Sequence, residues 1–136
     1  MKTLTNILNV TFVVLFTQLF ASTPDWEDAD FGTYAASAVV TGVVLDEDDV
    51  QLGDVGDLLA AFDSNGNVRG VQAPSEVTFP PSPYFGTLLY EMAIWGDDGD
   101  EISFKYYDAS SDAILEITQT YTFLTNEFLG DVMAPY

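Results

Sequence analysis

The chain of 136 residues contains no cysteine and no histidine. Without cysteine, neither disulfide bonds nor thiol chemistry can contribute to its stability or activity. Without histidine, it lacks the usual general base near neutral pH and the commonest protein ligand for zinc and copper. The nucleophile motif G-x-S-x-G is also absent. These absences weigh against catalysis and leave carboxylates as the abundant ionisable groups.

Positive charge is scarce as well, because three Lys and Arg stand against 22 Asp and Glu, a net charge of −19. Such a surface repels nucleic acid and anionic lipid, so neither is an expected partner. The negative charges on this surface also repel one another unless salt screens them. At about 0.5 M salt the Debye length falls to about 4–5 Å, so most of this repulsion is screened. Two interpretations stay open: adaptation to salty water or divalent cations, and acidity that serves solubility alone.

The first 21 residues predict a secretory signal peptide. Lys2 is followed by an apolar run of 14 residues at positions 7–20, and the small residue Ala21 comes directly after this run. This order is typical of a signal sequence, whereas a membrane-spanning helix needs about 20 apolar residues. An uncleaved anchor and a buried helix are the alternatives. We therefore expect a secreted or cell-surface protein with a signal peptide at 1–21, an acidic arm at 22–33 and one folded domain at 34–136.

The remaining chain predicts an all-β fold, an antiparallel β-sandwich of about seven strands with an Ig-like or jelly-roll-like architecture. The clearest strand, residues 102–107, alternates Ile, Phe and Tyr with Ser, Lys and Tyr, so one face should lie on a core and the other in water. Asn65-Gly66 between two apolar runs predicts a hairpin. The acidic turn at 97–100 should join residues 88–95 and 102–107 as another hairpin. Further strands are expected at 34–45, 57–62, 68–72, 76–79, 114–123 and 131–136.

These segments resemble a poorly characterised module of secreted and cell-surface proteins from marine algae and Bacteroidetes-type bacteria. The shared pattern consists of D-x-L-A-A-F at 57–62, R-G-V at 69–71, Tyr84, and G-D-E-I-S-F-K-Y-Y-D-A at 99–109. The match covers roughly residues 26–136. The resemblance implies an extracellular β-sandwich, usually one unit of a multi-module protein, with adhesion or glycan binding as its usual role and no established catalytic residues. Other members often carry Ser, Asn or Thr at the positions of Asp97 and Asp98, so a metal site there would not belong to the family.

Two acidic turns, each built around a glycine, are candidate calcium sites. Calcium takes six to eight oxygen ligands, and alternating Asp and Asn around glycine is how short loops supply them. Neither turn completes the twelve-residue calcium loop, because the final glutamate is missing. The alternative is plain turn chemistry, since Asp, Asn and Gly are the common turn residues. The predicted ligands are Asp63, Asn65, Asn67, Asp97, Asp98 and Asp100.

Arg69, Tyr84, Phe85 and Tyr107 are the candidate ligand-binding residues. Arg69 could grip a carboxylate of an acidic glycan through its planar fork, or it could form an ion pair within the protein, as could Lys105. Tyr84 and Phe85 lie in a proline-rich loop, and Tyr107 lies on the face of its strand expected to meet water. Their rings could stack on sugars, although aromatic residues also build cores.

The sequence therefore predicts a secreted, non-catalytic adhesion or glycan-binding module. Calcium is its candidate cofactor, and extracellular glycans or other surface proteins are its expected partners. The alternative is a structural subunit of an extracellular matrix or surface layer, assembled through sheet edges or cation bridges. A small carboxylate-dependent glycosidase is the more distant alternative, because a domain of this size rarely forms the deep cleft that such chemistry requires.

Overall fold

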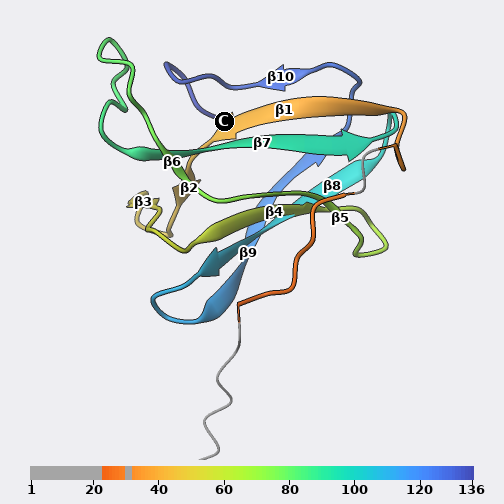
Figure 1. Cartoon of the computed structure of the whole chain (residues 1–136), viewed down its shortest axis with the longest axis horizontal. Helices are drawn as coiled ribbons and strands as arrows, with labels where there is room; N and C mark the ends of the chain where they lie inside the picture. The colour runs from red at the N-terminus through yellow and green to blue at the C-terminus, as the bar shows by residue number, and fades with distance from the viewer. Residues whose placement is uncertain (1–22, 30–31) are drawn as a thin grey trace, which may run out of the picture.

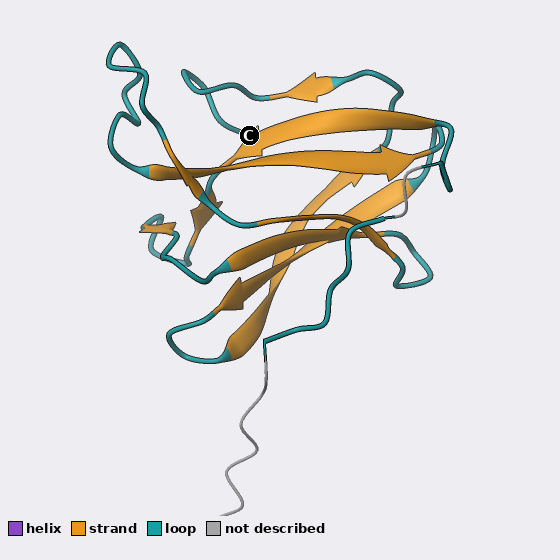
Figure 2. Ribbon diagram, in the orientation of Figure 1, coloured by secondary structure: helices purple, strands orange, loops and turns teal. Residues whose placement is uncertain are grey.

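A computed structural model describes residues 23–29 and 32–136. The predicted signal peptide lies outside the described residues. Ten strands and no helix form within the described part of the chain, so no described helix is long and apolar enough to cross a membrane. Figure 2 shows strands joined by loops and turns throughout. The predicted all-β, sandwich-like class is confirmed, with more strands than the seven expected.

Two four-stranded sheets form the layers of the fold (Figure 1). The first has the order β10-β1-β7-β6 and consists of β1 (Ala36–Gly42), β6 (Ser75–Glu76), β7 (Leu88–Gly96) and β10 (Phe128–Leu129). The second has the order β5-β4-β8-β9 and consists of β4 (Leu58–Phe62), β5 (Val68–Gln72), β8 (Glu101–Asp108) and β9 (Ala113–Thr122). A separate small hairpin pairs β2 (Val44–Leu45) with β3 (Gln51–Leu52). These pairings are antiparallel, except that β10 runs parallel to β1.

The core lies between the two sheets and is built by alternate residues of their central strands. On β8 the predicted inner face, with Ile102, Phe104 and Tyr106, is buried as expected. Alternate residues of β7 supply the opposing layer: Tyr90, Met92 and Ile94. Strand alternation thus places one face of the central strands β7 and β8 out of water, and such burial is the main source of stability in a sandwich.

The hairpin predicted from Asn65-Gly66 is confirmed. Strands β4 and β5 pair antiparallel on either side of this turn. Gly66 adopts a φ of 83°, a conformation that glycine reaches without the steric cost of a Cβ atom. The turn closes through a hydrogen bond from the Gly66 N–H to the Asp63 carbonyl at 3.0 Å.

The second predicted hairpin is wrong, because β7 and β8 belong to different sheets. β7 pairs with β1 and β6, whereas β8 pairs with β4 and β9. The acidic turn at 97–100 is therefore a corner that carries the chain from one layer to the other. The Gly99 N–H and the Asp100 carbonyl bond to the backbone of Phe123, just beyond β9, at 2.9 and 2.8 Å. A local sequence pattern identifies a strand and a turn, but it does not identify the strand's partner.

The other differences arise at breaks and at very short strands. The strand expected at 34–45 divides at Val43 into β1 and β2, and the backbone of Tyr136 bonds to Thr41 and Val43 at this break. The strand expected at 131–136 is absent, and β10 precedes that segment. The short strand expected at 76–79 forms instead at β6. Four strands contain only two residues each, which is too short for an alternating pattern to reveal them.

The described part of the acidic arm packs on the domain through its tryptophan. The Trp26 ring meets the Phe62 ring edge-on, with centroids 5.5 Å apart. Edge-to-face contacts of this kind are a preferred aromatic geometry. This contact anchors the described part of the arm to the sandwich.

Candidate functional site

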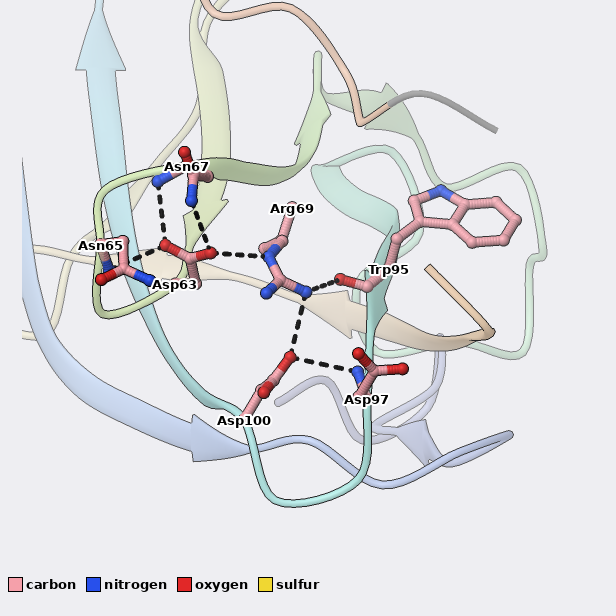
Figure 3. A network of polar contacts seen from close by, with 7 residues as sticks. All are labelled: Asp63, Asn65, Asn67, Arg69, Trp95, Asp97 and Asp100. Carbon is pink, nitrogen blue, oxygen red and sulfur yellow. Dashed lines mark hydrogen bonds and ion pairs between the residues drawn. The ribbon is translucent and has the colours of Figure 1, made fainter. Parts of the chain in front are cut away.

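Arg69 of β5 joins the two predicted calcium turns at one end of the sandwich (Figure 3). Its Nε donates to Asp63 Oδ2 at 3.0 Å, and its Nη1 donates to the Trp95 carbonyl and lies near Asp100 Oδ2, both at 3.1 Å. The guanidinium carbon also lies 3.7 Å from the centroid of the Tyr34 ring. Arg69 is 7% exposed. The structure supports the ion-pair interpretation, and a buried Arg69 is not accessible to the carboxylate of an external glycan.

Asp63 has no lone pair left for a metal ion. Its Oδ1 accepts the N–H groups of Asn65 and Asn67 at 2.8 and 3.0 Å, and its Oδ2 accepts Asn67 Nδ2 and Arg69 Nε, both at 3.0 Å. A carboxylate has about four acceptor sites, so these four bonds fill them. Burial by itself raises the pKa of Asp63, but the hydrogen bonds from Asn67, Arg69 and Asn65 outweigh it and lower the pKa to about 2. Asp63 is thus a charged structural anchor.

The second turn is likewise bound up in internal contacts. Asp100 Oδ2 accepts the Asp97 N–H at 3.1 Å in addition to its ion pair with Arg69. Asp98 Oδ1 accepts the Thr125 N–H at 2.6 Å, and hydrogen bonding to Thr125 lowers the pKa of Asp98. Within the described residues, no group of three or more acidic side chains is arranged to hold a metal. The geometry favours turn chemistry at both loops, and calcium binding stays a prediction.

Tyr107 does not face water, contrary to the prediction. It is 4% exposed, and its hydroxyl donates to Asp112 Oδ1 at 2.8 Å, a bond that raises the pKa of Tyr107. Hydrogen bonding with Thr23 of the N-terminal arm lowers the pKa of Tyr107 and so offsets part of this rise. The contact with Thr23 places the arm beside the outer face of β8. The ring therefore has no open face for a sugar. Alternation along β8 could not reveal that the arm lies over its outer side.

Tyr84 and Phe85 lie in a loop that is both uncharged and aromatic. We call residues 77–87 the aromatic loop, and the sequence holds no charged residue between Glu76 and Glu91. Phe85 is 54% exposed, and Tyr84 is half-buried. Phe79 in the same loop is also exposed, and the prolines at positions 80 and 81 are the sequence signal that places it in the loop. In Figure 1 the loop projects beyond the strands that precede and follow it, β6 and β7.

The aromatic loop is held in shape by its own hydrogen bonds. Val77 and Thr87 form its base, where the Val77 N–H donates to the Thr87 carbonyl at 2.9 Å. The buried Ser82 hydroxyl donates to the carbonyl of Val132 in the C-terminal segment and accepts the Tyr84 N–H at 3.0 Å. Rings on such a loop lose little conformational freedom when they bind a ligand.

Beside the aromatic loop, a groove of about 800 Å³ runs between β9 and the β2–β3 hairpin. Tyr84 reaches it from the loop, and Tyr136 reaches it from the C-terminal end. Leu45 and Leu115 form apolar parts of its wall, and acidic side chains, among them Asp46 and Glu116, line it as well. No local sequence pattern could reveal this groove, because its lining residues come from six separate stretches of the chain between Val43 and Tyr136.

The most buried carboxylate among the described residues, Asp57, has a structural role. It is 1% exposed, and its oxygens accept the N–H groups of Ala109 and Asp54 and the hydroxyl of Tyr106. These bonds tie the loop before β4 to the end of β8. Asp57 opens the D-x-L-A-A-F pattern, but no local signal in the sequence identifies its distant partners Tyr106 and Ala109.

Comparison with known proteins adds no relative. No protein-family model matches the chain, and no curated protein or solved structure matches it significantly. The resemblance to a module of marine algae and Bacteroidetes-type bacteria stays a prediction.

Proposed function

We propose that this chain is a secreted, non-catalytic binding module that holds an extracellular glycan on its aromatic loop. The observation that carries the proposal is a pre-shaped loop presenting Phe79, Tyr84 and Phe85 in a segment without charge. Aromatic faces bind apolar faces of flat ligands with specific geometry. Small-ligand sites combine such rings with a few fixed polar groups.

The charge of the molecule favours a neutral glycan over an acidic one. The net charge is −19, and Arg69, the cation suggested as a carboxylate grip, is buried in ion pairs. Lys105 lies on β8 and is paired with Glu116 at 2.9 Å. An anionic sugar would therefore meet repulsion without a compensating cation.

A binding role fits the carboxylates better than hydrolysis does. The acidic side chains that line the groove, Asp46, Glu47 and Glu116, are exposed. A glycosidase keeps its general acid protonated by burying it in an apolar site, close to a second carboxylate. Asp57 is buried, but its hydrogen bonds hold it inside the fold.

The proposal is tested by screening the purified protein on an array of neutral glycans and measuring the affinity of a hit by calorimetry. Phe85→Ala and Tyr84→Ala should each weaken binding by about three- to tenfold, because an aromatic contact contributes about 0.5–1.5 kcal/mol. Phe128→Ala is the matched control, since Phe128 is 77% exposed on β10, outside the loop. The proposal fails if no glycan binds, or if Phe128→Ala weakens binding as much as the loop variants do.

A further inference from the structure

The last strand of the second sheet, β9, has a free edge along its ten residues. It pairs with β8 on one side. On the other side, no backbone group of the described chain bonds to it, and its contact there is the Tyr136 hydroxyl at 3.5 Å from the Thr120 carbonyl. An edge of this kind presents unpaired N–H and C=O groups, and proteins usually shield such edges with charge or keep them short.

The other three edge strands of the two four-stranded sheets are either very short or packed against a neighbouring strand. β6 and β10 contain two residues each. β5 contains five residues and packs closely against β7, because a Cβ atom at Gly70 would lie 2.3 Å from the Ala93 carbonyl oxygen. β9 is twice as long as β5, and its one charged residue, Glu116, is paired with Lys105 of the adjacent strand. Its edge therefore lacks the usual protection.

The groove lies where the side chains of an added strand would point. Leu115 and Ile117 pair with Tyr106 and Phe104 of β8, so they share the inner face of the sheet, yet Leu115 is 44% exposed. Leu45 of β2 also lines the groove beside these residues. Successive side chains of a strand alternate between the two faces of a sheet. Every second side chain of a strand laid against β9 would therefore enter this groove, where Leu45, Leu115 and Ile117 provide apolar contacts.

We infer that β9 and its groove accept an extended, cationic segment of another protein as a fifth strand of the sheet. Main-chain hydrogen bonds to β9 supply the docking, and apolar side chains at alternate positions fill the groove, as in other cases of strand addition. Charge decides the kind of partner. Asp46, Glu47 and Glu116 line the groove of a chain with a net charge of −19, so basic residues between the apolar ones are attracted, whereas a second copy of this chain is repelled.

The test uses a dye-labelled synthetic peptide of about nine residues, with valine at alternate positions and lysine or threonine between them. Binding to the full chain is measured by fluorescence anisotropy in physiological salt. Leu115→Asp should weaken binding at least tenfold, although it adds a negative charge that would by itself attract the peptide. Leu124→Asp is the matched control, because Leu124 is 51% exposed and lies outside β9, and it should change the affinity less than twofold.

Two further measurements separate strand addition from charge attraction. N-methylation of alternate peptide amides should abolish binding, and bound peptide should slow hydrogen exchange at residues 113–118. A peptide of the same composition in shuffled order should bind at least tenfold more weakly. The proposal is overturned if the cationic peptide does not bind, if shuffled or methylated peptides bind equally well, or if the protein alone forms dimers that Leu115→Asp dissociates. Phe85→Ala should leave peptide binding unchanged, so failure here is distinct from failure of the glycan proposal.

Discussion

Replacing Arg69 with methionine should destabilise the protein by about 3 kcal/mol. Removing one partner of a buried ion pair costs about 3–5 kcal/mol, because the other charge stays buried without compensation. We expect the lower end for two reasons. Asp63 keeps its hydrogen bonds from Asn65 and Asn67, and the Asp100 side chain is 32% exposed, so water can replace its partner.

Urea unfolding followed by tryptophan fluorescence measures this loss, because the surroundings of Trp26, which packs on Phe62, and of Trp95 in β7 change when the domain unfolds. Lys105→Met is the matched control, because Lys105 is the only other cation in the sequence beyond residue 2. Its pair with Glu116 joins side chains that are 35% and 72% exposed. Exposed pairs contribute about 0–1 kcal/mol, so the control should lose less than about 1 kcal/mol.

The dependence of the free energy of unfolding on acid pH is a second measurement. A simple packing defect would leave this dependence unchanged. The pKa of Asp63 is about 2 in the folded protein and 3.8 as its ordinary value. Since the folded pKa is the lower one, this carboxylate contributes about 2 kcal/mol above pH 4, and the contribution is lost as the pH falls toward 2. Arg69 donates one of the bonds that lower the pKa, so Arg69→Met should lose less stability on acidification than the unmodified protein.

A double-mutant cycle with Asp63→Asn completes the test. The two side chains share a hydrogen bond and an ion pair, so their coupling energy should be about 1–3 kcal/mol. A loss below about 1 kcal/mol for Arg69→Met, a coupling energy near zero, or an unchanged acid profile would show that Arg69 does not hold the two turns together.

Two further predictions concern the interior and the metal. Tyr106→Phe should cost about 1–3 kcal/mol, because buried Asp57 loses a hydroxyl donor. Tyr90→Phe should cost less, because the buried Tyr90 hydroxyl holds no carboxylate and its contact with Tyr106 falls short of hydrogen-bond geometry. Equal losses in thermal unfolding would contradict this. Exchanging EDTA for millimolar calcium at fixed ionic strength should leave the unfolding temperature unchanged, because the oxygens of Asp63 are already bonded. A rise of several degrees specific to calcium would instead support the site predicted from the sequence.

Local sequence patterns predicted the strands that are long enough to repeat them. The alternation at 102–107 and the Asn65-Gly66 turn both correspond to observed elements, β8 and the β4–β5 hairpin. Both signals act over a few residues, through side-chain direction and allowed backbone angles. Strands of two residues, such as β2 and β10, form because neighbouring chain segments happen to lie beside them, and no local pattern records that.

In the candidate site, too, local sequence patterns predicted some features, whereas others depend on contacts between distant segments. The proline-rich composition marked Tyr84 and Phe85 as loop aromatics, and Phe85 is exposed as such a position allows. Tyr107 was misjudged because the arm that lies beside it is remote in sequence. The function of Arg69 as a link between the turns at 63–67 and 97–100 likewise needed both turns in one place.

The sequence alone determined that this chain forms strands, carries an excess of negative charge and contains an uncharged aromatic loop, because each is a property of neighbouring residues or of composition. The tertiary structure decided which strands pair, which carboxylates are already bonded and which edge is left open. Those outcomes depend on segments tens of residues apart that meet only after the two sheets have packed, since β7 and β8 follow one another in sequence yet belong to different layers.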